Sequence, residues 1–268
     1  MRTPIYIIDA FADTRMTGNP AGVCPLDHWL PDHVMQSIAS EMNLSETVFF
    51  VPSASGPDKV ESRDFDVRWF TPTREVDMIG HATLAAGHFV LSKLAPSLDA
   101  VRFLSESAKL SVCRGEQMLL MDMPALKPKP IPEPTGLADA LGAEPSEILA
   151  AKHYLAVFDS VEEIINMRPN FDALAKLDLP AVIVSAQGYG EFDFVSRFFA
   201  PANGVPEDSV SGVAHCCLAP YWSQRLKRSK TLGRQVSRRG GTVHCEHVGD
   251  RVTLGGNCVI TLEGTIFV

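Results

Sequence analysis

Three polar side chains next to strongly apolar segments have the chemistry of proton transfer. Glu46 directly precedes the β-rich run 47–51, and a carboxylate at the mouth of such a run can act as a general acid/base. His81 lies in the first turn of an apolar segment, where the helix dipole favours the neutral imidazole. Asp208 stands a few residues before a second apolar segment. Each residue also has a plain structural interpretation: a surface or helix-end glutamate, a core histidine and a helix cap.

Other common catalytic chemistries lack their sequence signatures. The six cysteines are scattered, with no CxxC motif and no Cys/His set at zinc-site spacing. We therefore expect buried free thiols and no metal. The chain also has no Ser-His-Asp order, phosphate-binding loop or dinucleotide fingerprint.

The elements that must position these groups are two segments, 80–91 and 213–222, that are apolar on nearly every face. A helix without a polar face is buried, so each segment is predicted to lie inside its own sheet. A helix start presents free N–H groups and a partial positive charge. Two such starts facing one cleft would bind a small anion such as a carboxylate. His88 and His215 lie deeper in these segments and are predicted to be structural.

An internal repeat relates the two halves of the chain. Residues 64–72 match residues 193–201 at five of nine positions, and Glu75 and Glu207 follow the two copies. Each half reads as a strand, a proline-containing loop, a glycine and an apolar helix. The same order in both halves indicates a duplication.

A proline-rich stretch separates the halves. Five prolines lie between Met123 and Gly136, a density that forbids helix and suits an extended connector. We place a domain boundary there, giving an N-terminal domain of residues 1–123 and a C-terminal domain of residues 124–257. Strands outnumber helices and do not alternate with them as βαβ units. The fold class is therefore α+β, with two similar domains, each of mixed or antiparallel strands around one apolar helix.

Local patterns predict further elements. Apolar residues at helical spacing predict an amphipathic helix over 31–42, and Ser160 with Glu163 resembles a capping box. The C-terminal part, 235–268, is strand-like, with turns expected near 249–250 and 263–264.

Charge and composition exclude several classes of function. The formal net charge is −8, which argues against nucleic-acid backbone binding as the main task. A membrane-spanning helix needs about 20 mostly apolar residues, and no such run occurs. The N-terminal residues are too polar for a signal peptide, so a cytoplasmic protein is expected.

Taken together, five motifs resemble the PhzF family of phenazine-biosynthesis isomerases and their relatives. In chain order they are Gly-Asn-Pro-Ala-Gly-Val at 18–23, Asn-Leu-Ser-Glu-Thr at 43–47, Arg-Trp-Phe-Thr-Pro at 68–72, Gly-His-Ala-Thr-Leu-Ala at 80–85 and Glu-Asp-Ser-Val-Ser-Gly-Val-Ala-His-Cys at 207–216. The resemblance covers nearly the whole chain, from residue 11 to the C-terminus.

This resemblance implies a diaminopimelate epimerase-like fold: two pseudo-symmetric domains, each a barrel-like sheet around a central helix, with the active site in the cleft between them. It implies that residues 258–268 return to the first domain. It further implies isomerisation of a small carboxylate without cofactor or metal, of the trans-2,3-dihydro-3-hydroxyanthranilate isomerase type, and a possible homodimer. Glu46 would shuttle the proton, with His81 and Asp208 as partners. The substrate-contacting positions map to Asn19, Ser45, Gly80, Ser211 and Gly212.

Departures from the family pattern keep alternatives open. Racemases of the wider superfamily use a facing pair of cysteines, whereas Ile79 precedes the first helix glycine and Ser211 the second. Cys216 and Cys217 lie one turn further on, so a two-thiol racemase is the weaker alternative. Val213 replaces a serine of the family pattern, which bears on the identity of the substrate. A non-catalytic ligand-binding or interaction relative is the alternative from another class.

Overall fold

The computed structural model describes residues 2–53, 64–106 and 109–268. They form two compact units. Unit 1 comprises the described residues up to Asp122 together with Gly255–Val268, and unit 2 comprises Met123–Leu254. These limits differ by one residue at the linker and by three at the C-terminal return from the boundaries drawn above.

Unit 1 is a mixed sheet with helices. Its strands are β1 (Arg2–Ala10), β2 (Asn19–Pro25), β3 (Glu46–Pro52), β4 (Asp64–Phe70), β5 (Glu75–Val76), β6 (Ala100–Leu104), β7 (Lys109–Arg114) and β18 (Cys258–Phe267). Its helices are α1 (Asp32–Met42), α2 (Gly80–Phe89) and the π-helical turn η1 (Val90–Leu94). A further strand, β8 (Leu119–Pro124), begins in this unit.

Unit 2 has the same kind of content. Its strands are β9 (Lys129–Pro130), β10 (Glu147–Ala150), β11 (Tyr154–Phe158), β12 (Val182–Gln187), β13 (Phe194–Ala200), β14 (Val205–Asp208), β15 (Lys230–Gln235) and β16 (Gly241–Val248), followed by β17 (Arg251–Gly256). Its helices are α3 (Leu137–Leu141), α4 (Val161–Asn166), α5 (Phe171–Leu174), the 3-10 turn η2 (Pro201–Asn203) and α6 (Gly212–Leu226).

The two units repeat one pattern of strand pairing. In unit 1, β1–β2 is antiparallel, β2–β3 parallel, β3–β4 and β4–β5 antiparallel, β4–β6 parallel and β6–β7 antiparallel. In unit 2, β10 to β16 pair in the same sequence of senses. The repeated segments of the sequence form the equivalent strands β4 and β13. The α+β fold with pseudo-symmetric halves is therefore as predicted, and the duplication accounts for it.

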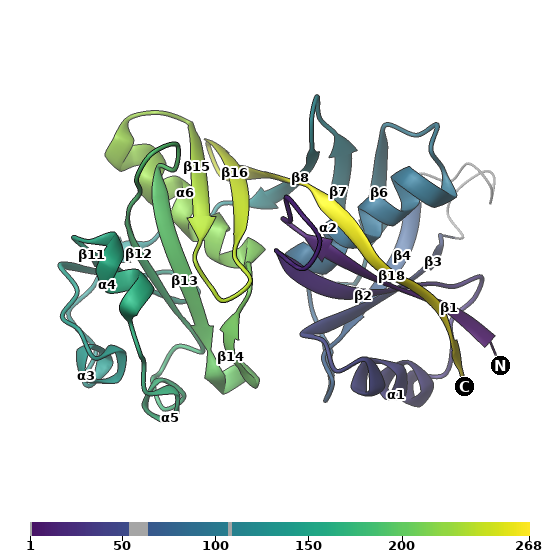
Figure 1. Ribbon diagram of the computed structural model, residues 1–268, viewed down its shortest axis with the longest axis horizontal. Helices are drawn as coiled ribbons and strands as arrows, with labels where there is room; N and C mark the ends of the chain where they lie inside the picture. Colours follow the sequence, from purple (N-terminus) through teal and green to yellow (C-terminus); the bar gives the residue numbers. More distant parts are fainter. Residues whose placement is uncertain (1, 54–63, 107–108) are drawn as a thin grey trace. The chain divides into compact units, whose positions relative to one another are not determined.

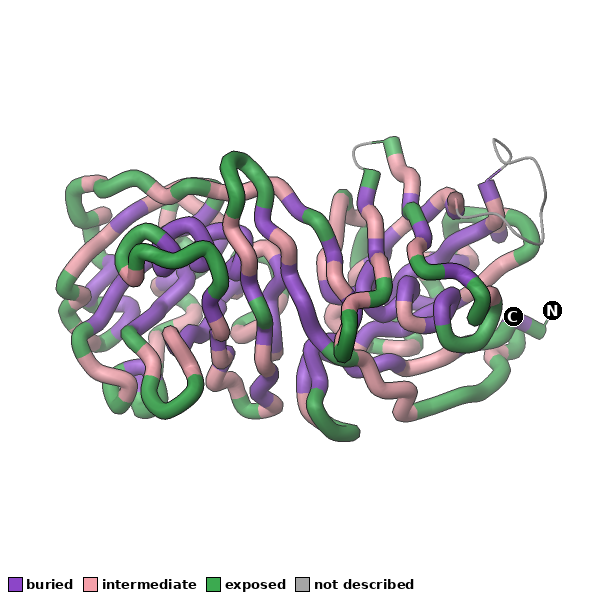
Figure 2. Tube along the Cα trace, turned by 90° about the horizontal axis from the view of Figure 1, so that it is seen from above, coloured by how far each residue is buried: buried purple, intermediate pink, exposed green. Residues whose placement is uncertain are grey.

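Both apolar helices are central to their own units (Figure 1). Helix α2 packs against β1, β2, β3 and β7, and helix α6 packs against β15 and β16. A Cβ on Gly87 would lie 2.6 Å from Cγ1 of Val112, so glycine permits the close approach of α2 to β7. Buried backbone follows the interior of each unit in Figure 2. The prediction of two buried helices from their all-round apolar sequence is confirmed.

The local predictions hold with one exception. Helix α1 and the Ser160–Glu163 capping box form as expected, and the turn at 249–250 is present. The turn predicted at 263–264 is wrong, because β18 continues through it. Glu263 stands opposite Tyr6 of β1, and the next residue remains in register. Continuous pairing with β1 satisfies the backbone there and overrides the local turn propensity.

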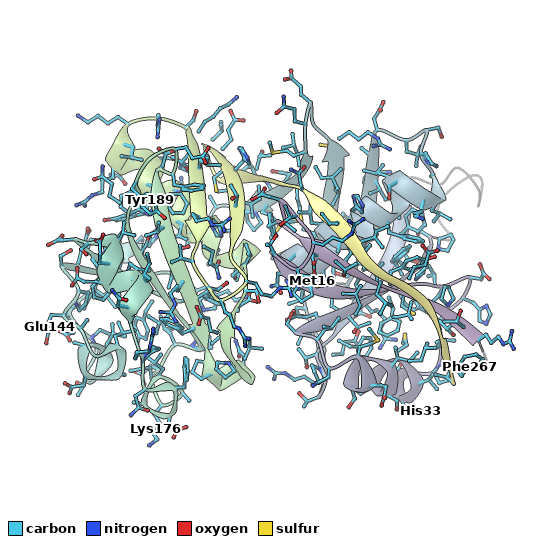
Figure 3. The ribbon with its side chains drawn as sticks, in the orientation of Figure 1. Met16, His33, Glu144, Lys176, Tyr189 and Phe267 are labelled. Atoms are coloured by element: carbon cyan, nitrogen blue, oxygen red, sulfur yellow. The ribbon has the colours of Figure 1, made fainter. Side chains whose placement is uncertain are left out.

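A few large apolar side chains remain exposed on the surface, and Figure 3 labels three of them, Met16, Tyr189 and Phe267. Met16 and Phe267 in unit 1 and Tyr189 in unit 2 are more than half exposed, and each belongs to a different loop or strand. The guanidinium of Arg2 lies over the Phe267 ring, 5.3 Å from its centroid. Isolated exposed apolar side chains of this kind do not define an interface, so the homodimer stays a prediction. In the part of the chain that the structure describes, no helix has the length and hydropathy to cross a membrane.

Candidate active site

In unit 1, five residues predicted to touch substrate or reacting atoms come from three separate pieces of chain. Asn19 begins β2, Ser45 and Glu46 lie where the chain enters β3, and Gly80 and His81 form the first turn of α2. The parallel pairing of β2 with β3 brings their first residues to one edge of the sheet. We call these five residues the Glu46 cluster.

The polar atoms of the Glu46 cluster converge on the His81 imidazole. His81 Nε2 lies 3.3 Å from Glu46 Oε2 and 3.4 Å from Ser45 Oγ. Ser45 Oγ in turn lies 3.5 Å from Asn19 Oδ1. These distances exceed those of tight hydrogen bonds, as is common in catalytic groups before substrate binds. The structure therefore places the residues within reach of one another, with room for the cluster to tighten.

Burial sets the charge state of His81. Its side chain is 5% exposed, and desolvation lowers its pKa to about 3. The imidazole is therefore neutral at pH 7, and its contact with Glu46 is not an ion pair, although the atoms lie at ion-pair distance. The sequence predicts the neutral form correctly but assigns it to the helix dipole, whereas the dominant cause is burial.

Helix α2 is fixed at its start by a short relay of hydrogen bonds. The indole Nε1 of Trp69 donates to Thr83 Oγ1 at 3.1 Å, and Thr83 Oγ1 donates to the carbonyl of Ile79 at 2.6 Å. Ile79 is the residue before the helix begins. The relay ties the first turn of α2, and with it His81, to strand β4. Neither Trp69 nor Thr83 is predicted from the sequence as a site residue. Thr83 gives one signal, a polar residue inside an apolar helix.

In unit 2, the predicted residues Asp208, Ser211 and Gly212 lie in one continuous stretch, which we call the Asp208 segment (residues 208–212). Asp208 ends β14, and Gly212 begins α6. Ser211 is the helix cap, since its Oγ accepts from the Ala214 N–H at 3.3 Å. The free N–H groups at this helix start can hold an anion, which agrees with the chemistry expected from the sequence.

In each unit, an arginine–glutamate pair joins the two strands that precede the central helix, at equivalent positions of the repeat. In unit 1, Arg68 binds Glu75 through two contacts of 2.7 and 2.5 Å. In unit 2, Arg197 binds Glu207 through two contacts of 2.7 and 2.9 Å. A bidentate pair of this kind fixes geometry as well as charge. The repeat aligned these residues in the sequence but did not reveal that they pair.

The adjacent thiols of α6 are buried. Cys216 and Cys217 are 1% and 2% exposed, and burial raises the pKa of each to about 12. A thiol is nucleophilic or basic only as thiolate, so neither group is prepared for racemase chemistry. The expectation of buried free cysteines is confirmed for these two residues.

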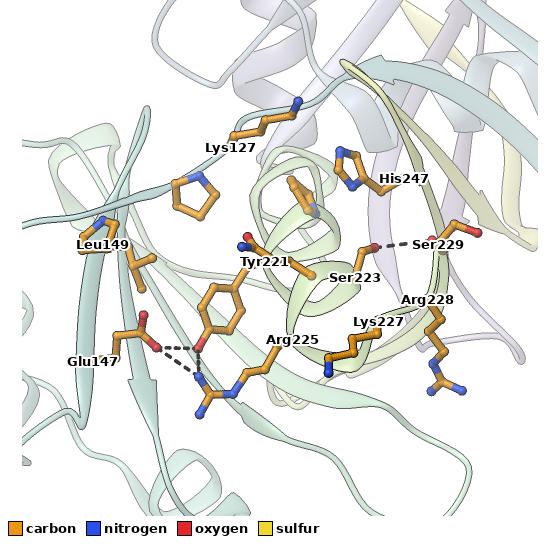
Figure 4. Close-up of a pocket in the computed structure, with 14 residues that line it drawn as sticks. Lys127, Glu147, Leu149, Tyr221, Ser223, Arg225, Lys227, Arg228, Ser229 and His247 are labelled. Atoms are coloured by element: carbon orange, nitrogen blue, oxygen red, sulfur yellow. Dashed lines mark hydrogen bonds and ion pairs between the residues drawn. The ribbon is translucent and has the colours of Figure 1, made fainter.

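Unit 2 also contains a cavity of about 910 Å³ that none of the predicted residues lines (Figure 4). At its wall the Tyr221 hydroxyl donates to Glu147 Oε2 at 2.7 Å, and Arg225 lies 3.2 Å from the same oxygen. This carboxylate is already engaged by two groups of its own unit.

Comparison with known proteins identifies the family. The family model described as PhzC-PhzF, phenazine biosynthesis-like protein, matches residues 8–264. The chain belongs to the PhzC-PhzF family. A relative named as an uncharacterized isomerase of Pseudomonas aeruginosa is 44% identical over 99% of both chains, and the human phenazine biosynthesis-like domain-containing protein is 34% identical over 99% of both chains.

Solved structures of PhzF proteins superpose closely. A PhzF family protein of Enterococcus faecalis matches with a TM-score of 0.93 at 39% identity over the full length of both chains. A hydroxyproline epimerase of Agrobacterium vitis matches with a TM-score of 0.59 at 8% identity over 99% of this chain and 91% of that one, which shows a shared fold alone. The resemblance to PhzF proteins and the diaminopimelate epimerase-like fold are thus confirmed.

Proposed function

We propose that this PhzF family protein is an isomerase that moves a proton within a small carboxylate substrate, with Glu46 as the acid/base. One observation carries the proposal: Glu46 Oε2 lies 3.3 Å from an imidazole that burial keeps neutral. An imidazole with a pKa of about 3 is a weak base and does not compete for the proton at neutral pH. The carboxyl of Glu46 is then the group in the cluster that can take up and release it.

The proposed step breaks one C–H bond and forms another on the same substrate. Glu46 as carboxylate removes an acidic ring proton, and the electron pair shifts along the ring. The carboxyl then returns the proton to another carbon on the same face, so Glu46 ends as it began. His81 donates from Nε2 to the charge that develops as the electrons move. No cofactor enters this scheme.

The remaining predicted residues are assigned supporting roles. We propose that Asn19, Ser45 and Gly80 contact the substrate, and we extend the same role to Ser211 and Gly212 at the start of α6. Asp208 is proposed as a second polar partner of the reacting groups. The family resemblance supports these roles, and the positions within each unit are compatible with them.

The test is proton exchange followed by NMR. Wild type and Glu46→Gln are incubated in D₂O with trans-2,3-dihydro-3-hydroxyanthranilate and a panel of small carboxylates. We expect deuterium to enter a ring or α carbon with wild type, and the variant to be slower by at least about 100-fold, the usual contribution of an acid/base. Glu41→Gln is the matched control, because Glu41 is exposed on α1.

Two outcomes would contradict the proposal. Full exchange by a folded Glu46→Gln protein would remove Glu46 from the mechanism. Saturable binding of a panel compound by wild type without exchange would instead favour the ligand-binding alternative. A thermal unfolding curve of the variant that overlays wild type shows that the fold is intact.

A further inference from the structure

The Asp208 segment is held by a residue outside it that has no place in the proposed chemistry. Gln235, the last residue of β15, has a side chain with 0% exposure. Its Oε1 accepts from the Ser211 N–H at 2.9 Å, and its Nε2 donates to the Asp208 carbonyl at 2.8 Å. One buried amide thus joins both ends of a four-residue stretch that contains two of the predicted site residues.

A second contact fixes the middle of the same stretch. Ser237 Oγ donates to the Ser209 carbonyl at 2.6 Å and accepts from the Gly240 N–H at 3.1 Å. The turn after β15 therefore binds the Asp208 segment through backbone atoms of three of its residues. Because all three contacts are to backbone atoms, they fix the path of the main chain rather than the rotamer of a single side chain.

The helix side of the segment is held as well. His215 Nδ1 lies 2.8 Å from the Ser211 carbonyl, which can only accept, so this nitrogen carries the hydrogen. Ser211 is therefore held at its N–H by Gln235, at its carbonyl by His215 and at its Oγ by the helix. The direction of the first free N–H groups of α6 depends on these contacts.

The equivalent place in unit 1 has a different residue. In the strand register, Gly233 pairs with Phe194, and Phe103 pairs with Phe65, the residue equivalent to Phe194. Two residues further along each strand stand Gln235 and Ser105. Ser105 carries no amide, so it cannot offer one atom as acceptor and a separate NH₂ group as donor in the way that Gln235 does. The amide contact is thus specific to the half of the protein with the Asp208 segment.

We propose that Gln235 is a positioning residue: it fixes the backbone that carries Asp208 and the helix-start N–H groups in the geometry that the substrate requires. This inference rests on the proposed function, since it assumes that the Asp208 segment contacts substrate. Loss of the amide leaves Ser211 N–H and the Asp208 carbonyl without these partners. A shift of about 1 Å in a substrate-positioning group can cost about 100-fold in rate.

The first experiment needs no substrate. Hydrogen exchange of peptides covering 205–215 is compared between wild type, Gln235→Met and Gln187→Met, by mass spectrometry. Gln235→Met keeps the length of the side chain and removes both hydrogen bonds, and Gln187→Met is the matched control at an exposed position in unit 2. We expect faster exchange in 205–215 for Gln235→Met alone, with peptides of β12 unchanged. Unchanged exchange in that segment would overturn the proposal.

The second experiment uses activity and a conservative variant. On a substrate that wild type turns over, Gln235→Met is expected to lower kcat/KM by about 10- to 100-fold. Gln235→Glu has the same shape, and its neutral form can accept from Ser211 N–H and donate to the Asp208 carbonyl. Burial raises the pKa of a carboxyl, so this form is populated at mildly acidic pH. The ratio of its kcat/KM to that of wild type is expected to rise as pH falls.

These outcomes separate the two proposals. The other titratable groups near this segment, Glu207, Asp208 and His215 among them, are present in both proteins at each pH, so the ratio reports residue 235. A flat ratio, or an unchanged kcat/KM in Gln235→Met despite faster exchange, would reject the positioning role. If wild type binds a panel compound without proton exchange, the proposed function fails by its own test. A 205–215 segment that exchanges as slowly in Gln235→Met as in wild type would independently reject the role of the amide contact.

Discussion

Substitution of Arg197 is expected to destabilise unit 2 far more than the equivalent substitution of Arg68 destabilises unit 1. The two arginines occupy the same place in the repeat and bind Glu207 and Glu75 in the same bidentate manner. Arg68 also donates to Asp32 at 2.8 Å, but that carboxylate is 80% exposed. The main difference between the two arginines is solvent access. The Arg197 and Glu207 side chains are 10% and 20% exposed, whereas those of Arg68 and Glu75 are 26% and 43% exposed.

The expected loss of unfolding free energy depends on which groups lose their partners when each arginine is replaced. Arg197 also donates to the carbonyls of Ile164 and Met167, at 3.1 and 2.9 Å. Arg197→Met retains the packing stem but leaves Glu207 as a half-buried charge and frees both carbonyls. Breaking a buried pair in this way costs about 3–5 kcal/mol. Arg68→Met breaks its pairs with Glu75 and Asp32, which water already screens and which are worth about 0–1 kcal/mol each.

The assay is urea unfolding with hydrogen exchange read separately on peptides of each unit. The two arginine variants are compared with wild type. Glu207→Gln and the Arg197→Met/Glu207→Gln double variant complete a cycle that isolates the pair. The double variant is expected to be more stable than Arg197→Met, because no unpaired carboxylate remains. Equal losses of unfolding free energy for Arg68→Met and Arg197→Met would refute the reasoning that burial sets the value of these pairs.

Two further predictions concern buried titratable groups. Burial lowers the pKa of His81 to about 3 and of His153 and His215 to about 4, below the unfolded value of 6.5. Between these pKa values the unfolded chain binds more protons than the folded chain, so the stability from these groups is full above pH 6.5 and falls as pH drops toward 4 and below. NMR titration of the imidazoles and unfolding measurements at each pH check this. An imidazole of these three that titrates near pH 6.5 in the folded protein would contradict it. The thiols of Cys216 and Cys217 should resist iodoacetamide in the native state at pH 8 and react on unfolding, as peptide mass spectrometry would show; loss of activity on labelling of either thiol would revive the two-thiol racemase.

Several features of the site follow from local sequence. The all-round apolar composition of 80–91 and 213–222 is enough to predict buried helices, because a helix without a polar face has no stable place at the surface. The repeat around Arg68 and Arg197 predicts equivalent strands, which the shared pairing of β4 and β13 shows. The motifs are enough to identify the family over residues 8–264.

The repeat, the two buried helices, the residue types at their starts and the family can all be predicted from the amino-acid sequence. That Asn19, Ser45 and Glu46 lie close to His81, and that burial rather than the dipole keeps His81 neutral, became visible in the folded chain. The tertiary structure alone showed that Gln235 joins Asp208 to Ser211 from 24 to 27 positions away. The physical reason is range: periodicity and capping depend on neighbours within a few residues, whereas desolvation and long-range hydrogen bonds depend on which strands pack together.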